Sequence, residues 1–345
     1  MESRERVLRA IHGEAVDRIP SNFRAEIVTQ NKLLRATGLS VDAFCDAYDV
    51  DIRAIDAIPP AEKKMEGFYQ NFWGERYVYI DTEFGKERQD MDGALSGAEC
   101  LEDIEAFPWP DNDDMDHSHI PALCDRYAGR AILYGSGDIW QRPGLVRGME
   151  NFMIDMVINS EFCHFMSKRY TDFYIEDYRR AQEMSGGRID IFQIFSDLGT
   201  QRAPLISKDM LKTYVLPYLK QIADAVHEMN AKLLFHTCGM IEPFIDLLVE
   251  TGVDILDPLQ PCAEQMQPEY LQAHHGGKVV FHGGIDVQGV LVNGSEEEVR
   301  KTVARYRSAF DAKGYICCPS HLFQVDTPVE NMRALYEEIV HPRYE

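Results

Sequence analysis

The stretch Leu233-Leu234-Phe235-His236-Thr237-Cys238-Gly239 joins a short apolar run to an abrupt polar end, and a helical pattern over residues 241–251 follows it directly. A run of this kind predicts a buried strand that leads into a helix. The alternation recurs along the chain, where strand candidates are separated by longer helical patterns: residues 19–23, 50–55, 131–136, 189–195, 232–236, 253–257, 279–283 and 315–318. Alternating strands and helices predict a parallel sheet covered by helices. Eight such units in a chain of 345 residues predict a (β/α)8 barrel, with an open doubly wound sheet as the alternative.

Residues 68–95 interrupt this rhythm. Tyr77-Val78-Tyr79-Ile80-Asp81 is followed by Thr82-Glu83-Phe84-Gly85, a pattern typical of an antiparallel hairpin. We therefore expect an inserted β-hairpin over residues 68–95, outside the barrel. The chain shows no linker, so we expect residues 1–345 to form one barrel domain.

Composition narrows the classes of function. The chain is 45% hydrophobic and 27% charged, which is typical of a globular enzyme, and its net charge of −22 argues against a nucleic-acid partner. No apolar run reaches the roughly 20 residues that a membrane-spanning helix needs, and the first residues do not form a signal peptide. We expect a cytoplasmic protein without a membrane partner. The eight cysteines are unevenly spaced, so they do not indicate a disulfide framework.

His236 and Cys238 are the first candidate site. Residues two apart in an extended segment point to the same side, so an imidazole and a thiolate can meet beyond the strand end. Both are good zinc ligands, and a catalytic zinc takes three protein ligands and keeps one open position. Cys317, Cys318 and His321, at the end of the last strand candidate, can supply the third ligand. The alternative is a buried thiol beside a core histidine.

Polar residues also follow five consecutive strand candidates, and in a barrel the chemistry lies at the carboxyl ends of the strands. They are Ser196 and Asp197, His236 and Cys238, Asp257 and Gln260, His282 and Asp286, and Cys317, Cys318 and His321. Asp197 and Asp286 are predicted to orient substrate or support the metal. Candidate substrate-binding residues are Tyr134, Trp140, Phe195, Gln260 and His282. Each of these residues can instead have a purely structural role, such as a helix cap for Asp197 or a core position for His282.

The chain resembles the uroporphyrinogen decarboxylase superfamily. The resemblance lies in Ser3-Arg4-Glu5-Arg6-Val7-Leu8 and Val16-Asp17-Arg18-Ile19-Pro20, then in Asp197-Leu198-Gly199-Thr200-Gln201, His236-Thr237-Cys238-Gly239, His282-Gly283-Gly284-Ile285-Asp286, Pro319-Ser320-His321 and Asp326-Thr327-Pro328-Val329-Glu330-Asn331. It covers almost the whole chain and implies a (β/α)8 barrel that is often a homodimer.

Two branches of this superfamily differ in the segment after the first strand and in their zinc-binding pattern. True decarboxylases carry Met-Arg-Gln-Ala-Gly-Arg after the first strand, whereas this chain has Asn22-Phe23-Arg24-Ala25-Glu26-Ile27. The other branch contains corrinoid-linked methyltransferases, similar to methylcobalamin:coenzyme M methyltransferase and to O-demethylase components. Its zinc pattern is His-x-Cys plus a later Cys in Ala-Pro-Gly-Cys, which matches His236, Cys238 and, with Cys replaced by His, His321. An imidazole in place of a thiolate makes the site less negative and a stronger Lewis acid.

The leading hypothesis is therefore a zinc-dependent methyltransferase. It would move a methyl group between a small O-, N- or S-methyl compound and a corrinoid (cobalamin) carried by a partner protein. A second hypothesis is a metal-free decarboxylase or lyase that clamps a small carboxylic acid with arginines, for which the candidates are Arg24, Arg53, Arg142, Arg147 and Arg202. A third is a protein that binds a corrinoid or tetrapyrrole without chemistry.

Overall fold

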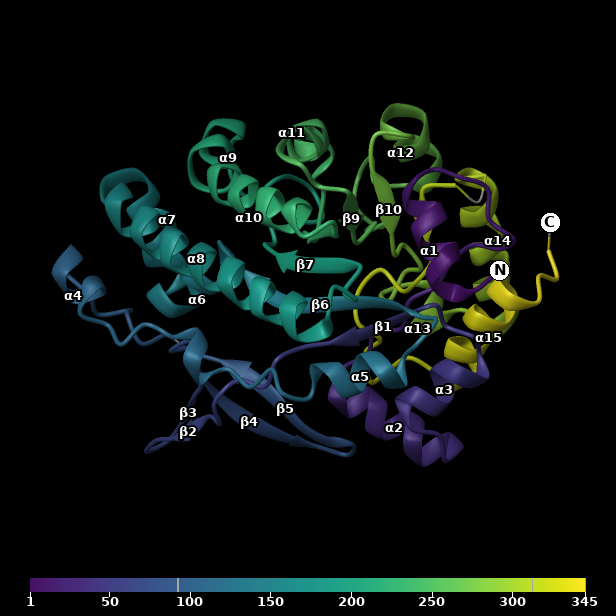
Figure 1. Ribbon diagram of the computed structural model, residues 1–345, viewed down its shortest axis with the longest axis horizontal. Coiled ribbons are helices and arrows are strands. Elements are labelled where there is room, and N and C mark those ends of the chain that lie inside the picture. Colours follow the sequence, from purple (N-terminus) through teal and green to yellow (C-terminus); the bar gives the residue numbers. More distant parts are fainter. Residues whose placement is uncertain (92, 312, 345) are drawn as a thin grey trace.

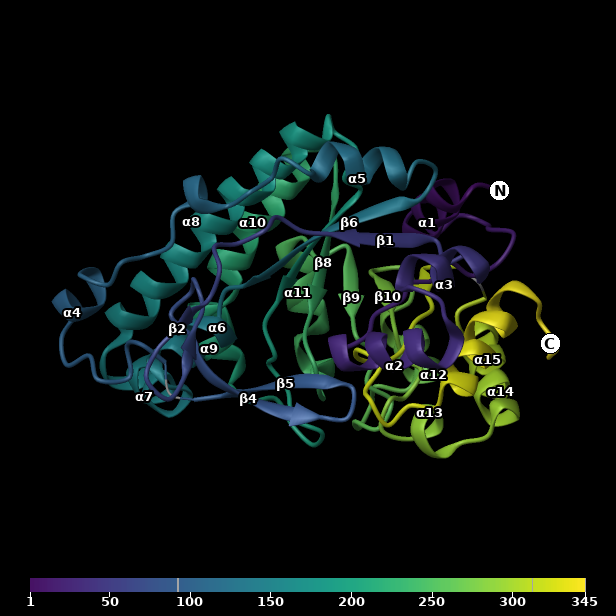
Figure 2. The same cartoon turned by 90° about the horizontal axis from the view of Figure 1, so that it is seen from below.

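A parallel seven-stranded sheet forms the centre of the computed structural model, which describes residues 1–91, 93–311 and 313–344. Its strand order is β1-β6-β7-β8-β9-β10-β11, so neighbours in space follow one another along the chain. The sheet curls, and helices cover its outer side (Figures 1 and 2). The strands are β1 (Ile52–Ile55), β6 (Ala131–Asp138), β7 (Ile191–Phe195), β8 (Lys232–His236), β9 (Ile255–Asp257), β10 (Val280–His282) and β11 (Tyr315–Ile316).

The segment around Ser21 lies between the two outermost strands of this sheet. The Asn22 N–H donates to the carbonyl of Cys317, next to β11, and Ser21 forms a parallel bridge with the same residue. On the other side, the Asp51 and Ile52 N–H groups donate to the carbonyl of Ser21. The predicted first strand, residues 19–23, is thus reduced to an isolated bridge that connects β11 with β1.

The interior of the curled sheet begins with an apolar layer. Seven of its side chains, one from each strand, form a cluster with Val7, Leu133 and Ile11: Ile52, Ala131, Ile191, Leu234, Ile255, Val280 and Ile316. Because side chains alternate along a strand, the residue two positions later points to the same side. The next layer toward the carboxyl ends therefore contains the residues two positions after Leu234, Ile255, Val280 and Ile316. These residues are His236, Asp257, His282 and Cys318.

Helices follow the strands, as the alternation predicted. The longest, α8, packs beside α10 along the outside of the sheet (Figure 1). The helices are α1 (Ser3–Ile11), α2 (Ile27–Thr37), α3 (Val41–Ala47), α4 (Leu101–Glu105), α5 (Ile120–Arg126), α6 (Gln141–Arg147), α7 (Met149–Ile158), α8 (Ser160–Ser185), α9 (Lys208–Tyr214), α10 (Leu216–Glu228), α11 (Ile245–Thr251), α12 (Pro268–His275), α13 (Val290–Asn293), α14 (Glu296–Ala309) and α15 (Val329–Val340), with 3-10 turns η1 (Asn112–Asp114) and η2 (Glu242–Phe244).

A second, antiparallel sheet lies to one side of the first (Figure 2). It consists of β2 (Lys63–Lys64), β3 (Tyr69–Gln70), β4 (Arg76–Thr82) and β5 (Gly85–Asp90). Strands β4 and β5 pair as a hairpin in which Thr82 faces Gly85. The Asn31 side chain of α2 donates a hydrogen bond of 2.9 Å to the carbonyl of Phe84, which attaches the hairpin turn to the main body.

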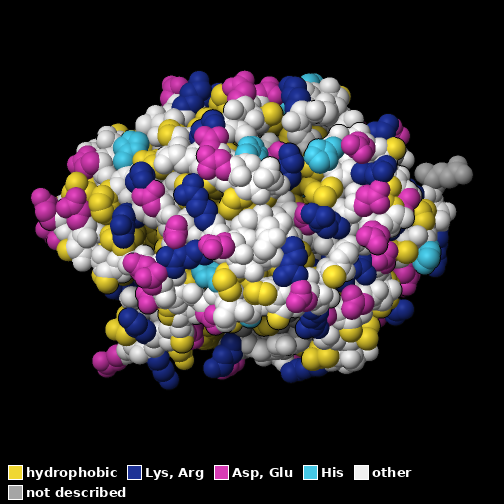
Figure 3. Space-filling model, viewed as in Figure 1, with side chains coloured by type: hydrophobic (Ala, Val, Ile, Leu, Met, Phe, Trp, Pro, Cys, Tyr) yellow, Lys and Arg dark blue, Asp and Glu magenta, His cyan; other side chains and the backbone are white. Residues whose placement is uncertain are grey.

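The surface mixes charges of both signs. Acidic and basic side chains are interspersed on the face seen in Figure 3, without a large area of one sign. Among the residues that the structure describes, no helix is both long and apolar enough to cross a bilayer.

Candidate metal centre

Three nitrogen and sulfur donors meet at the carboxyl ends of the strands. His236 is the last residue of β8, Cys238 follows it in the loop, and His321 belongs to the loop after β11. Their ligand atoms all lie within 4.8 Å of one another. The His236 Nε2 atom is 3.4 Å from the Cys238 Sγ atom, and the His236 and His321 rings are 5.9 Å apart between centroids. The structure thus brings together the three residues that the sequence predicted.

Asp257 orients the first of these donors. Its Oδ2 atom is hydrogen-bonded to His236 Nδ1 and accepts a bond of 2.5 Å from Arg24 Nη1. Because Nδ1 faces the carboxylate, the Nε2 lone pair of His236 is directed toward Cys238 and the cavity. Burial would raise the pKa of Asp257, but Arg24, His282 and His236 hold it well below its usual range. A carboxylate behind a ligating histidine is the usual support of a metal site.

A second cluster lies directly behind the first. Asp257, His282 and Cys318 are all buried, and their donor atoms also lie within 4.8 Å of one another. Here the imidazole is already used on both sides: His282 Nδ1 lies 2.5 Å from Asp257 Oδ1, and Asn22 Nδ2 lies 3.1 Å from His282 Nε2. The Cys318 Sγ atom is about equally far from the two ring nitrogens, at 3.5 and 3.6 Å. It therefore does not lie along either lone pair of the ring.

The donor chemistry of the first cluster fits zinc, which prefers imidazole and thiolate ligands. Burial, followed by the carboxylates of Asp197 and Asp257, raises the pKa of the Cys238 thiol. Burial, followed by His236 and Arg24, lowers the pKa of His321, so its imidazole stays neutral and keeps a lone pair. A neutral imidazole can bind a cation, and a divalent cation would also offset the cost of a buried thiolate.

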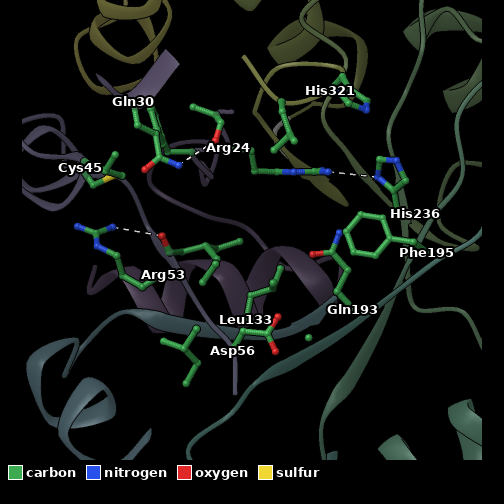
Figure 4. A pocket seen from close by; sticks show the side chains of 18 of the residues that line it. Arg24, Gln30, Cys45, Arg53, Asp56, Leu133, Gln193, Phe195, His236 and His321 are labelled. Carbon is green, nitrogen blue, oxygen red and sulfur yellow. Dashed lines mark hydrogen bonds between the residues drawn. The ribbon is translucent and has the colours of Figure 1, made fainter. Parts of the chain in front are cut away.

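Two cavities meet at this cluster. The first, of about 580 Å³, is bordered by His236 and His321, and the second, of about 690 Å³, by Cys238 and His321. Figure 4 shows the first cavity, with the Arg24 guanidinium directed at His236 and His321 beyond it. The cluster is therefore reachable from two sides.

The other predicted residues divide between these cavities and the core. Asp197 and Phe195 border the first cavity, and Gln260 and Asp286 border the second. The Asp197 carboxylate also accepts a 2.9 Å bond from the Cys238 N–H, which fixes the loop that carries the thiol.

Tyr134 and Trp140 lie elsewhere. Both are buried in the main core, where the Tyr134 hydroxyl donates to the Asp177 carboxylate. His282 belongs to the buried network behind the donors. Cys317 is buried as well, and burial raises the pKa of its thiol to about 12. The structure does not bring these four residues to either cavity.

Sequence reasoning did not identify Asp56 and Gln193 as site residues, although both border the first cavity. One signal was available, because Gln193 is the only polar residue in the strand Ile191-Phe192-Gln193-Ile194-Phe195. Asp56 gave no such signal, since it follows a short strand and resembles an ordinary turn residue.

Comparisons with known proteins identify the family and the fold of the chain. The family model "Uroporphyrinogen decarboxylase (URO-D)" matches residues 143–341. Uroporphyrinogen decarboxylase from Hordeum vulgare is 30% identical over 185 residues, or 52% of this chain and 51% of the relative. Methylcobamide:CoM methyltransferase MtbA from Methanosarcina mazei is 26% identical over 140 residues, or 41% of this chain and 39% of the relative. The chain thus spans about half, or less, of the length of these curated relatives.

The fold has a counterpart of nearly equal length. A solved methyltransferase from Methanosarcina mazei superposes with a TM-score of 0.74, covers 97% of both chains and is 14% identical. At this identity the likeness concerns the arrangement of strands and helices.

Proposed function

Because this chain belongs to the uroporphyrinogen decarboxylase family and is similar in sequence to methylcobamide:CoM methyltransferases, we propose that it is a zinc-dependent methyltransferase. It would exchange a methyl group between a small O-, N- or S-methyl compound and a corrinoid carried by a partner protein. The single observation that carries this proposal is the cluster of His236, Cys238 and His321 at the strand ends.

The residues around this cluster have distinct roles in the proposal. His236, Cys238 and His321 would hold the metal. Zinc bound there would act as a Lewis acid that stabilises negative charge on the heteroatom that loses or accepts the methyl group. Asp257 keeps the Nε2 atom of His236 free, and Asp197 holds the Cys238 loop in place. The two adjoining cavities give separate approaches for the methyl donor and the methyl acceptor.

The second candidate function is decarboxylation or lyase chemistry on a small carboxylic acid. The similarity to plant uroporphyrinogen decarboxylases favours it. That reaction needs cations to bind the acid. Four of the five candidate arginines are engaged with acidic side chains of the protein: Arg24 with Asp257, Arg53 with Asp46, Arg142 with Glu75 and Arg147 with Asp155. Arg24, the arginine nearest to the cluster, is thus already neutralised, which favours methyl transfer.

The test combines metal analysis with a methyl-transfer assay. Protein purified without chelator from zinc-replete cells should contain about one zinc per chain, because one three-ligand site is present. The assay follows the absorbance change on methylation or demethylation of cobalamin, with methoxylated aromatics, methylamines and thiols supplied in turn. Absence of stoichiometric zinc, or failure of the whole panel together with formation of coproporphyrinogen from uroporphyrinogen, would reverse the order of the two candidates.

A further inference from the structure

Asp56, which follows β1, stands beside Gly135 of β6 and Gln193 of β7 at the first cavity. Ile55 pairs with Tyr134, and Tyr134 pairs with Phe192, so the next residue of each strand lies at one level. All three border the cavity. Asp56 and Gln193 are separated by two strand spacings, or about 10 Å between backbones. At the position between them, Gly135, a Cβ atom would meet the Tyr178 side chain and the Gln193 carbonyl, both at 3.0 Å.

A bulge in β6 lies between Asp56 and Gln193. Two residues, Gly135 and Ser136, stand opposite Gln193 alone, because the register shifts between Tyr134 and Gly137. Gly135 has a φ of +107°, which other residues rarely adopt. The bulge also turns the Ser136 hydroxyl toward Asp56, to whose Oδ2 atom it donates a bond of 2.6 Å. Bulges often re-aim side chains beside functional sites.

Gln193 has an unused donor. Its side chain is 5% exposed, and within the described residues its Nε2 atom has no hydrogen-bond partner. An unsatisfied buried amide is costly, so such a group in a cavity indicates a ligand atom that accepts from it. Figure 4 places the Gln193 amide at the cavity beside Phe195 and His236, and Asp56 at the same end of the cavity.

Asp56 supplies the complementary acceptor. Its carboxylate is bonded by the Ser136 hydroxyl and by the Ala57 N–H, which leaves further lone pairs for a ligand. Burial raises the pKa of Asp56 to about 6, against the opposing effect of the Ser136 bond. The carboxylate is therefore poised to gain from a ligand that donates a hydrogen bond.

The charge around the cavity limits what this ligand group can be. Asp56 and Asp197 border it, whereas Asp42, Arg24 and Arg53, which also border it, are paired with Arg126, Asp257 and Asp46. A carboxylate would be repelled by these acids. An ammonium group would satisfy Asp56 but has no lone pair for Gln193. A hydroxyl group both donates and accepts, and it carries no charge.

We propose that Asp56 and Gln193 recognise a hydroxyl group of the substrate, which donates to Asp56 and accepts from the Gln193 amide. The substrate is then an uncharged, hydroxyl-bearing methyl compound whose apolar part lies along Phe195, Leu133 and Leu322. This inference rests on the proposed function only in taking the first cavity as the site of the methyl compound.

Calorimetric binding without corrinoid tests it on the full chain, with three probes that share one frame: 2-methoxyphenol, methoxybenzene and 4-methoxybenzoate. The wild-type protein should bind 2-methoxyphenol at least tenfold more tightly than the other two. Asp56→Asn and Gln193→Met should each reduce that preference at least fivefold. Asp113→Asn in the exposed η1 turn and Gln221→Met on the outer face of α10 are the matched controls, and they should keep it.

The proposal is overturned if the wild type binds none of the probes, if it shows no preference for 2-methoxyphenol, or if both cavity variants retain the preference. Cys238→Ala separates this result from the proposed function, because it should keep the binding preference and lose methyl transfer. Binding with the predicted preference but no methyl transfer by the wild type would contradict the proposed function alone.

Discussion

The two histidine and cysteine clusters contain similar atoms but use them differently. In the buried cluster, both nitrogens of His282 are occupied by Asp257 and Asn22, so its hydrogen-bonding capacity is met within the protein. In the cluster at the strand ends, Asp257 and Arg24 both face Nδ1 of His236, and Nε2 is left to Cys238, another member of the donor set. Proximity of ligand atoms is thus a weak criterion for a metal site. Donors that the protein leaves unused are a stronger one.

Loss of a donor from each cluster gives the largest expected contrast. Cys238→Ala should reduce zinc content from about one per chain to a small fraction of that, because two imidazoles alone hold zinc weakly. Cys318→Ala, the matched change in the buried cluster, should keep the metal. Elemental analysis of both variants after dialysis, with the wild type alongside, measures the difference.

The same comparison tests the third ligand. His321→Ala should lose zinc as Cys238→Ala does, since its imidazole completes the three-donor set. If His321→Ala kept zinc and Cys318→Ala lost it, the third ligand would be the buried thiol, and the distinction between the two clusters would be reversed.

Asp257 connects the clusters, so its replacement should affect both. Asp257→Asn leaves the buried Arg24 guanidinium without its counter-ion, and loss of one partner of a buried pair typically costs about 3–5 kcal/mol of unfolding free energy. It also removes the support of His236, for which a loss of zinc affinity on the order of 10- to 100-fold is typical. Urea unfolding and zinc competition with a chelator measure the two effects.

Asp224→Asn is the control for that change, because Asp224 is 56% exposed and pairs with Lys220 at the surface. Its unfolding free energy should change by less than about 1 kcal/mol. An Asp257→Asn variant that matched this control in stability and in zinc affinity would show that the carboxylate does not link the two clusters.

Much of the fold and the centre of the site follow from local patterns. The alternation of apolar runs and helical segments predicted the parallel sheet, and the spacing of His236 and Cys238 predicted that both side chains point one way. The neighbours of β11 and β1 depend on how the sheet curls, which no local pattern specifies. This is why the segment around Ser21, predicted as a full strand, forms only a bridge.

The remaining site residues depended on tertiary contacts. Tyr134 and Trp140 were plausible for a cavity because aromatic residues serve in cores and in cavities alike, and only packing places them in the core. The role of Arg24 as the partner of Asp257 joins residues 233 positions apart. The β6 bulge that aims Ser136 at Asp56 is a matter of register, which the sequence of one strand does not determine.

Asp56 is another group whose hydrogen-bonding capacity the protein leaves partly free for a ligand. Its contribution to the pH dependence of stability is the smallest effect that we expect to measure. Its pKa is raised to about 6 by burial, whereas an unfolded chain has an aspartate pKa of about 3.9. Below both values the carboxyl is protonated in either state and lowers stability little. As pH rises from about 4 to about 6, the unfolded chain loses the proton first, so the folded state is destabilised.

Asp56→Asn removes this ionisation. Relative to the wild type, the unfolding free energy of the variant should therefore increase between pH 4 and pH 7, by up to about 3 kcal/mol, since one unit of pKa difference corresponds to about 1.4 kcal/mol. Asp177, Arg142 and His119 also surround Asp56 and are charged or titratable, but they are present in both proteins, so their effects cancel in the difference. Urea unfolding at intervals of pH measures it. A difference that stays constant with pH would mean that Asp56 is not held in the protein at a cost to stability, and it would then belong with the satisfied groups of the buried cluster.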